Sequence, residues 1–170
     1  GLRARTFFGE GVVGHVSTAE PVDLGLAERL DKILKENNVN YSFGGSYVCI
    51  EGPQFSTKAE SNIYRSFNAD LIGMTNVPEA YLAKEAGIAY STIAMVTDYD
   101  CWKEEHCTLE EIMKVMANNN KTANILIPKI IESLNKSPID PKLENQFAVV
   151  TQKDLIPKEK EEVLKVLLEK

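Results

Sequence analysis

The sequence predicts an α/β fold, in which short buried strands alternate with helices. Apolar, β-branched runs such as 70–74 and 88–97 are typical of buried strands. Helix-capping signals stand between these runs. Strand, helix and strand follow one another here within about thirty residues, which implies a right-handed parallel crossover.

The composition indicates a single globular domain over residues 1–170. The chain is 44% hydrophobic and 26% charged, which is enough apolar material to bury a sizeable core. Its net charge is −6 and its basic residues are not clustered, so we expect no nucleic-acid partner. It holds no apolar run of about eighteen residues and no signal peptide at its start, so we expect no membrane partner and a cytoplasmic location. Because it opens on glycine and enters a strand-like segment almost at once, we interpret it as the later part of a longer domain.

The first forty residues are predicted to hold two short strands and a helix. Residues 5–8 and 12–16 read as a hairpin-like pair, with His15 near the end of the second strand. An amphipathic helix is expected from about residue 23 to residue 37, followed by a strand at 47–50. The apolar face of that helix comprises Leu26, Leu30, Ile33 and Leu34.

The segment 51–60 places an aromatic side chain beside the start of a helix. A Gly-Pro turn precedes Phe55, and Thr57 and Glu60 form a capping box that should start a helix at Lys58. The Phe55 ring is suited to a hydrophobic core or to stacking on a flat heterocycle, and the pattern alone leaves both alternatives open.

Thr75 stands between the strand at 70–74 and the next helix. Asn76 and Glu79 give a second capping signal, and Pro78 suits a first helical turn. Free backbone N–H groups and the positive end of the helix dipole would attract an anion beside Thr75. Threonine is also an ordinary cap residue, so a purely structural role remains open.

Two carboxylates, Asp98 and Asp100, follow the strand predicted at 88–97. Ligands of open α/β sheets bind outside the carboxyl ends of the strands, and side chains at i, i+2 share one side of an extended segment. Two acceptors there could bind an amino-substituted heterocycle, and one that holds a proton could protonate a ring nitrogen. The alternative is a solvated turn.

The cysteines predict no disulfide framework, because Cys49, Cys101 and Cys107 are few and unevenly spaced. Cys101 and Cys107 could still pair. Together with His106 they could also imitate a metal site, although their spacing matches no zinc pattern. We therefore expect no metal.

The region after residue 107 is predicted to be mainly helical. Thr108 and Glu111 form a third capping box, for a helix that reaches about Leu134 and that Pro128 should bend or split. Its apolar stripe comprises Ile112, Val115, Met116, Ala123, Leu126, Ile127 and Ile130.

The end of the chain is predicted to add one strand and one helix. A connector at 137–141 leads to a short strand at 147–150, and a closing amphipathic helix begins at Pro157. The residues of that helix expected to face the core are Leu164, Leu167 and Leu168.

Several motifs occur together in one order and spacing. They read IEGPQFSTKAES at 50–61, GMTNVPE at 73–79, LAKEAGI at 82–88 and AMVTDYDCW at 94–102, and HVSTAEP stands upstream at 15–21. This set closely resembles the 5′-methylthioadenosine phosphorylases of the purine nucleoside phosphorylase family. The resemblance extends to about residue 135 and weakens beyond it.

The resemblance implies a nucleoside phosphorylase-like, three-layer α/β fold with a mixed central β-sheet flanked by helices. It implies phosphorolysis of 5′-methylthioadenosine to adenine and 5-methylthioribose 1-phosphate, in purine and methionine salvage. No metal or organic cofactor is implied, since inorganic phosphate is the co-substrate. A homo-oligomer is implied, either a trimer or a dimer of trimers.

The resemblance also implies a role for each site residue on the purine side. Asp98 would face the purine N7 and assist its protonation as the catalytic group, and Asp100 would bind the exocyclic amine. Phe55 would pack on the base and Met74 on the ribose. Ser56 would lie on the base side of the pocket.

Two further roles concern the rest of the substrates. Thr75 would bind phosphate, and His15 would reach the 5′-alkylthio end of a neighbouring subunit's ligand. Family members carry a glycine-rich phosphate loop ahead of the point where this chain begins. We therefore expect either a separate N-terminal polypeptide that supplies it or a truncated enzyme.

Elementary chemistry agrees with the implied reaction. Breaking the glycosidic bond leaves a cation-like ribosyl centre and an electron-rich base, so a proton at the ring nitrogen and an anion near the anomeric carbon both accelerate it. An Asp98 that holds or shares a proton requires a desolvated site, with Asp100 as the nearby negative charge. The alternatives are another purine nucleoside phosphorylase and a nucleoside-binding fragment that is inactive without the phosphate-binding half.

Overall fold

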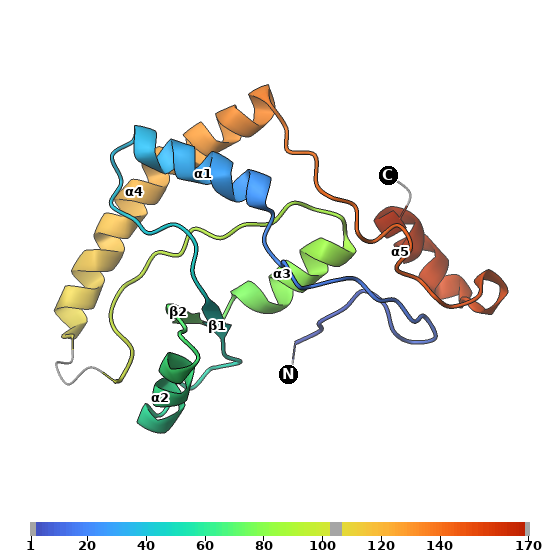
Figure 1. Ribbon diagram of the computed structural model, residues 1–170, viewed down its shortest axis with the longest axis horizontal. Coiled ribbons are helices and arrows are strands. Elements are labelled where there is room, and N and C mark those ends of the chain that lie inside the picture. The colour runs from blue at the N-terminus through green and yellow to red at the C-terminus, as the bar shows by residue number, and fades with distance from the viewer. Residues whose placement is uncertain (1–2, 103–106, 169–170) are drawn as a thin grey trace. The chain divides into compact units, whose positions relative to one another are not determined.

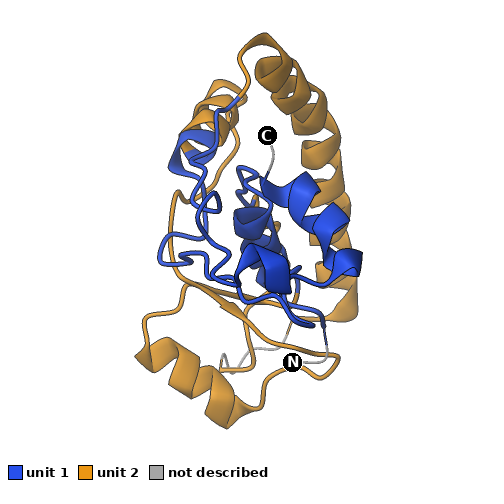
Figure 2. Ribbon diagram, turned by 90° about the vertical axis from the view of Figure 1, so that its right-hand side faces the viewer, with its two compact units in different colours: residues 1–27, 75–92, 139–170 blue, residues 28–74, 93–138 orange. Residues whose placement is uncertain are grey.

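The structure is a computed structural model that describes residues 3–102 and 107–168. Its elements in chain order are α1 (Leu24–Glu36), β1 (Tyr47–Cys49), α2 (Lys58–Ser66), β2 (Leu71–Gly73), α3 (Asn76–Glu85), α4 (Leu109–Lys136), the 3₁₀ turn η1 (Lys153–Leu155) and α5 (Lys158–Leu168) (Figure 1). They belong to two compact units, each built from separate stretches of chain (Figure 2). Unit 1 comprises residues 1–27, 75–92 and 139–170, and unit 2 comprises residues 28–74 and 93–138.

Helix α1 confirms the first predicted helix. It begins where the backbone N–H of Leu26 donates to Asp23 Oδ1 at 2.7 Å, which satisfies one free donor of the first turn. In unit 2, Ile33 and Leu34 of α1 pack with Leu126 of α4 in a buried cluster. This cluster removes the apolar face of α1 from water, as the amphipathic pattern predicts.

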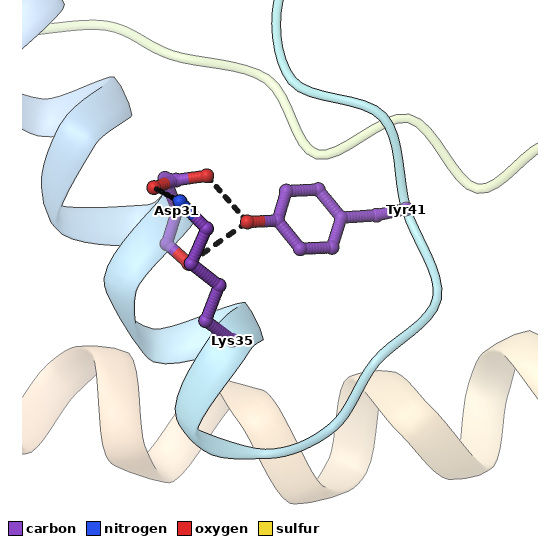
Figure 3. A network of polar contacts seen from close by, with 3 residues as sticks. All are labelled: Asp31, Lys35 and Tyr41. Carbon is purple, nitrogen blue, oxygen red and sulfur yellow. Dashed lines mark hydrogen bonds and ion pairs between the residues drawn. The ribbon is translucent and has the colours of Figure 1, made fainter.

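A polar network fixes the chain that leaves α1. Lys35 Nζ donates to Asp31 Oδ2 at 2.7 Å, and the Tyr41 hydroxyl donates to Asp31 Oδ1 (Figure 3). The hydrogen bond from Lys35, and to a smaller extent the one from Tyr41, holds the pKa of Asp31 below its ordinary value. The hydrogen bond to Asp31 raises the pKa of Tyr41 and of Lys35.

The sheet of the described residues consists of β1 and β2, which pair in parallel with Cys49 opposite Gly73. The strands predicted at 47–50 and 70–74 are therefore confirmed, each slightly shorter than expected. Ser46 N–H donates to Asp70 Oδ2 at 2.7 Å at the amino end of the pair. At the carboxyl end, Ile50 N–H donates to Gly73 O at 2.9 Å.

The strand predicted at 88–97 is wrong for this structure. The segment has no strand assignment, and Ile93, Met95 and Val96 are 37%, 50% and 54% exposed. An extended run becomes a strand only when a neighbouring backbone pairs with it, and within the described residues no strand pairs with this one. In unit 2, Asn119 Nδ2 of α4 instead donates to Val96 O at 3.0 Å.

Helix α4 begins at its predicted capping box and is not split. Thr108 Oγ1 accepts from Glu111 N–H at 3.2 Å, and Pro128 lies inside one continuous helix of 28 residues (Figure 1). The predicted stripe is only partly buried. Leu126 is buried and Ile112, Ala123 and Ile130 are half-buried, whereas Val115, Met116 and Ile127 are exposed.

Unit 1 has its own core, which the closing helix covers. Leu164 and Leu167 of α5 are buried with Phe8, Val12 and Ala148, and Leu168 packs against them, which confirms the inward face predicted for this helix. Asn145 is 2% exposed, and its Nδ2 donates to the carbonyl oxygens of Glu85 and Leu167, each at 2.9 Å. This amide therefore joins the ends of α3 and α5.

Where strands were predicted in unit 1, the structure has only isolated β-bridges among the described residues. Gly9 pairs with Val12 across a tight turn, and Gly14 pairs with Val149. The hairpin predicted at 5–8 and 12–16 and the strand predicted at 147–150 are therefore wrong as regular strands. The segments around residues 15 and 148 do lie side by side, since His15 N–H donates to Ala148 O at 2.9 Å. Their pairing is too short to form a regular strand. None of the described helices is long and apolar enough to cross a membrane.

Candidate functional site

The carboxyl ends of β1 and β2 lead into two segments that carry predicted site residues. β2 is followed by Met74, and β1 is followed by the loop 51–57. Gly52 has φ +70°, and a Cβ there would lie 2.7 Å from Met74 Sδ, so the loop backbone passes directly beside this side chain. The structure thus brings Met74 and the loop of Phe55 and Ser56 together.

A capping box fixes the end of this loop. Thr57 N–H and Thr57 Oγ1 both donate to Glu60 Oε2 at 2.7 Å, and Glu60 N–H donates to Thr57 Oγ1 at 3.2 Å. These bonds from Thr57 hold the pKa of Glu60 below its ordinary value. Phe55 is 86% exposed, which excludes the core alternative among the described residues and leaves its ring free for a ligand.

The acidic turn lies against the same loop. Asp100 is half-buried, and its Oδ1 accepts from Cys101 N–H at 2.9 Å. The next group along, Cys101 Sγ, donates to Ser56 O at 3.4 Å. Asp100 is therefore one residue away from a direct contact with the loop that carries Phe55.

Asp98 has a more open environment than its proposed chemistry requires. It is exposed, and its Oδ1 accepts from Thr97 Oγ1 at 2.5 Å. The desolvated surroundings expected for a carboxyl group that shares a proton with a base are not provided by the described residues. A bound purine would itself remove water from this carboxylate.

The side-chain oxygen of Ser56 is buried and has no hydrogen-bond partner among the described residues. Buried hydroxyl groups are normally paired, and an unpaired one requires an explanation such as a ligand or water. The backbone carbonyl oxygen of Ser56 also accepts a hydrogen bond from the Cys101 thiol. The unpaired hydroxyl therefore belongs to a residue that follows the exposed Phe55 and whose backbone contacts the acidic turn.

Sequence reasoning missed the contacts that Arg65, Tyr99 and Trp102 make beside the acidic turn. The Arg65 guanidinium of α2 lies over the Trp102 ring, 4.2 Å from its centroid. Tyr99 contacts the same ring edge-on, with 6.0 Å between centroids. An arginine in the last turn of α2 and the chain's single tryptophan just after two aspartates were the available signals.

Thr75 and His15 lie in unit 1, whereas the residues predicted on the purine side lie in unit 2. Thr75 is exposed at the N-cap position of α3 and its side chain makes no capping hydrogen bond. Val77 interrupts the first turn with extended backbone angles (φ −117°, ψ 130°). His15 is exposed, and its backbone N–H is used by Ala148 O.

The capping role predicted for Asn76 is wrong. Its Oδ1 accepts from the Tyr90 hydroxyl at 3.1 Å and from Thr92 Oγ1 at 2.5 Å, so it ties the start of α3 to the segment 90–92. The Asn76 side-chain oxygen is therefore used by two hydroxyl donors, and the backbone at Val77 leaves the first turn of α3 irregular.

Two alternatives for the cysteines were a Cys101–Cys107 disulfide and a metal site that also used His106. Cys49, Cys101 and Cys107 are free in the structure, so Cys101 and Cys107 are not paired there. His106, the third member of the metal alternative, lies outside the described residues. Within the described residues, no group of histidine, cysteine and carboxylate side chains is arranged to hold a metal ion.

The chain is similar in sequence to known enzymes. It is 42% identical over 169 residues to the S-methyl-5′-thioadenosine phosphorylase of Geobacter sulfurreducens, a match that covers 98% of this chain and 59% of that protein. It is 47% identical over 137 residues to the enzyme of the same name from Hyperthermus butylicus, covering 80% of this chain and 50% of that protein. The chain thus spans 59% of the first relative's length and 50% of the second's.

Solved structures show the same fold. The crystal structure of a methylthioadenosine phosphorylase from an antarctic soil metagenomic library matches with a TM-score of 0.88 and 38% identity, covering 98% of this chain and 60% of that one. A methylthioadenosine phosphorylase from Schistosoma mansoni in complex with adenine matches with a TM-score of 0.73 and 30% identity, covering 81% and 56%. These matches confirm the predicted nucleoside phosphorylase-like α/β fold class.

The family assignment rests on the sequence as a whole. Residues 1–132 match the pattern of the phosphorylase superfamily. The matched range contains every motif from HVSTAEP at 15–21 to AMVTDYDCW at 94–102. The resemblance to methylthioadenosine phosphorylases noted from those motifs is confirmed by the relatives above. This chain belongs to the phosphorylase superfamily.

Proposed function

We propose that the protein to which this chain belongs catalyses the phosphorolysis of 5′-methylthioadenosine to adenine and 5-methylthioribose 1-phosphate. This chain supplies the purine-binding part. The observation that carries the proposal is the Ser56 hydroxyl, which is buried without a partner among the described residues. Ser56 follows the exposed Phe55, and its backbone carbonyl accepts from Cys101, beside Asp100. The relatives and structural neighbours that are named for this activity support it.

The proposed reaction breaks the bond between the sugar C1′ and the purine N9. The electron pair of that bond passes to the purine, a phosphate oxygen bonds to C1′, and a proton is placed on the base. Asp98 assists protonation at N7, which makes the purine a better leaving group. As the purine binds, it displaces water from the exposed Asp98 carboxylate and strengthens this contact.

The remaining purine-side residues bind and orient the substrate. Asp100 accepts a hydrogen bond from the 6-amino group, a role that suits a carboxylate whose second oxygen has no hydrogen-bond partner among the described residues. Phe55 packs on the face of the base and Ser56 donates to or accepts from its edge. Met74, held beside Gly52, packs on the ribose.

The phosphate side of the site is incomplete in this chain under the proposal. Thr75, with a side chain that makes no capping hydrogen bond, is one phosphate ligand. The chain spans 59% of its Geobacter relative, so the other phosphate ligands belong to sequence outside this chain, on the same or a separate polypeptide. We further infer a cytoplasmic trimer or dimer of trimers without metal or organic cofactor, in which His15 reaches a neighbouring subunit's ligand.

Two alternatives differ in what they predict for binding. Another purine nucleoside phosphorylase would bind 6-oxopurines well, whereas the Asp100 acceptor favours 6-aminopurines. A nucleoside-binding fragment would bind adenine but would show no turnover without the phosphate-binding half.

The test is equilibrium binding of adenine and hypoxanthine to this chain, for the wild type and Asp100→Asn. We expect the wild type to prefer adenine, and Asp100→Asn to lose at least about tenfold in adenine affinity, the scale of one hydrogen bond to a charged group. Asp140→Asn, at an exposed connector position, is the matched control. A wild-type chain that binds neither base would overturn the proposal, and a preference for hypoxanthine would favour the 6-oxopurine alternative.

A further inference from the structure

Arg65 makes a contact that the proposed chemistry does not use. Its guanidinium lies 4.2 Å from the centroid of the Trp102 ring, within the range of an attractive cation–π interaction. Both residues belong to unit 2, but they come from different segments, since Arg65 is in the last turn of α2 and Trp102 follows the acidic turn. The contact therefore joins α2 to the turn of Asp98 and Asp100.

Helix α2 is in turn continuous with the loop of Phe55 and Ser56. The capping box between Thr57 and Glu60 fixes the first residue of the helix directly after that loop. Side chains on a helix lean toward its N-terminus, so Arg65 leans back toward the loop end of α2. Loop and helix thus act as one support for the acidic turn.

The turn is attached to this support at two successive residues. Cys101 Sγ donates to Ser56 O at 3.4 Å, and the neighbouring Trp102 ring lies under Arg65. Asp100 is fixed to the same pair, because its Oδ1 accepts from Cys101 N–H at 2.9 Å. Thiol hydrogen bonds are weak, so the Arg65–Trp102 contact has a large share in holding the turn.

We propose that Arg65 is a positioning residue that, through Trp102, sets the place of Asp100 and thereby the selectivity for 6-aminopurines over 6-oxopurines. This inference rests on the proposed function, in which Asp100 accepts from the 6-amino group. Arg65 acts on the base only through Trp102 and Cys101. Its loss therefore lowers adenine affinity more than hypoxanthine affinity, whereas a purely structural role would lower both equally.

Trp102 provides a direct signal for this contact, because it is the only tryptophan in the chain. The experiment compares the wild type, Arg65→Met and Arg65→Lys by Trp102 fluorescence and by titration with adenine and with hypoxanthine. Arg5→Met is the matched control, since Arg5 lies over the Tyr81 ring, 5.6 Å from its centroid, in unit 1.

We expect Arg65→Met to change the Trp102 emission and to reduce the adenine-to-hypoxanthine affinity ratio about two- to fivefold, the scale of one exposed cation–π contact. Arg65→Lys retains a cation but not a planar group and should lie between the wild type and Arg65→Met. Arg5→Met should match the wild type in both signals.

The outcomes separate this inference from the proposed function. If the wild type binds adenine selectively and both Arg65 variants keep the same affinity ratio, the positioning role is wrong while the proposed function stands. If circular dichroism shows that Arg65→Met is unfolded, the Arg65→Lys variant decides the question. A fall in its adenine-to-hypoxanthine affinity ratio supports the positioning role, and an unchanged ratio contradicts it. A wild type that binds neither base contradicts the proposed function and this inference with it.

Discussion

The Cys101 thiol donates a hydrogen bond to the backbone carbonyl oxygen of Ser56 across 3.4 Å. This contact brings together two segments that lie 45 residues apart in the chain. One carries the acidic turn and the other carries the exposed Phe55 ring. The loop of Phe55 and Ser56 and the acidic turn therefore meet in unit 2 even though the strand predicted before the acidic turn is not formed.

Replacing Cys101 should weaken base binding without unfolding the chain. Cys101→Ala removes the thiol donor, so we expect adenine affinity to fall about twofold, the low end of the range for one net hydrogen bond, because a thiol is a weak donor. Equilibrium dialysis with labelled adenine measures this change. Cys107→Ala, at an exposed free thiol, is the control and should bind as the wild type does. Equal affinity for both variants would show that the thiol does not hold the turn.

Two buried serine hydroxyls should respond differently to removal. Ser56 Oγ and Ser61 Oγ both lack hydrogen-bond partners among the described residues, and Ser61 lies inside α2. Ser61→Ala removes an unpaired polar group and improves helix propensity, so we expect the free energy of unfolding to rise by about 1 kcal/mol. Chemical denaturation followed by circular dichroism measures it.

Ser56→Ala should also be tolerated by the fold, but it should lower adenine affinity at least about threefold because the hydroxyl is kept for the ligand. Ser61→Ala should bind adenine as the wild type does. If Ser56→Ala binds equally well, the unpaired hydroxyl has no part in the site.

Gly73 is required by the Tyr47 hydroxyl, which fills the space that a side chain at residue 73 would occupy. Gly73→Ala should therefore reduce the free energy of unfolding by about 1–3 kcal/mol, the usual cost of overpacking. Tyr47→Phe removes the hydroxyl and leaves the ring carbon Cζ at 2.9 Å from the added Cβ. The double variant should recover part of the loss.

A double-mutant cycle of Gly73→Ala with Tyr47→Phe provides the measurement. Thermal or urea unfolding of the four proteins should give a favourable coupling between the two substitutions. A Gly73→Ala cost that is the same in both backgrounds would contradict the account of this contact.

The Asp31–Tyr41 hydrogen bond should give a pH-dependent stability. The pKa of Asp31 is lowered in the folded chain, so its contribution is present above the ordinary value of 3.8 and is lost as the pH falls through the folded value. The pKa of Tyr41 is raised, so its contribution is present below the ordinary value of 10.0 and is lost as the pH rises through the folded value.

Tyr41→Phe should therefore be less stable than the wild type by a constant margin between about pH 4 and pH 10, and the margin should shrink on either side. Urea unfolding at a series of pH values measures the margin. Tyr64→Phe, in the same unit, is the control and should show no such profile. A margin that does not vary with pH would mean that the carboxylate and the phenol do not interact.

Local signals predicted the helices well because capping depends on a few neighbouring residues. The boxes of Thr57 with Glu60 and of Thr108 with Glu111 gave the starts of α2 and α4 to the residue. The inward leucines of α5 followed from helical periodicity in the same way. Both are properties of a single segment.

Features that depend on a second segment could not be predicted in this way. The run 88–97 has the composition of a strand, but pairing requires a partner backbone, and the described residues offer none. Asn76 has the composition of a cap but is used by Tyr90 and Thr92.

Site roles for Phe55, Ser56 and the two aspartates were predicted from motif resemblance, whereas the Arg65–Trp102 contact needed coordinates. An arginine and an aromatic residue 37 positions apart leave no periodic signal in the sequence.

The most direct test of the central claim is phosphate-dependent release of adenine from 5′-methylthioadenosine at saturating substrate, for the wild type, Asp98→Asn and the control Asp140→Asn. The chain is assayed together with a polypeptide that supplies the part of its relatives' length that it does not match. We expect the wild type and Asp140→Asn to release adenine and Asp98→Asn to be at least about 100-fold slower, because protonation at N7 is lost. Asp98→Asn with nearly full turnover would contradict the role of Asp98, and no release by any of the three would contradict the proposed phosphorylase activity.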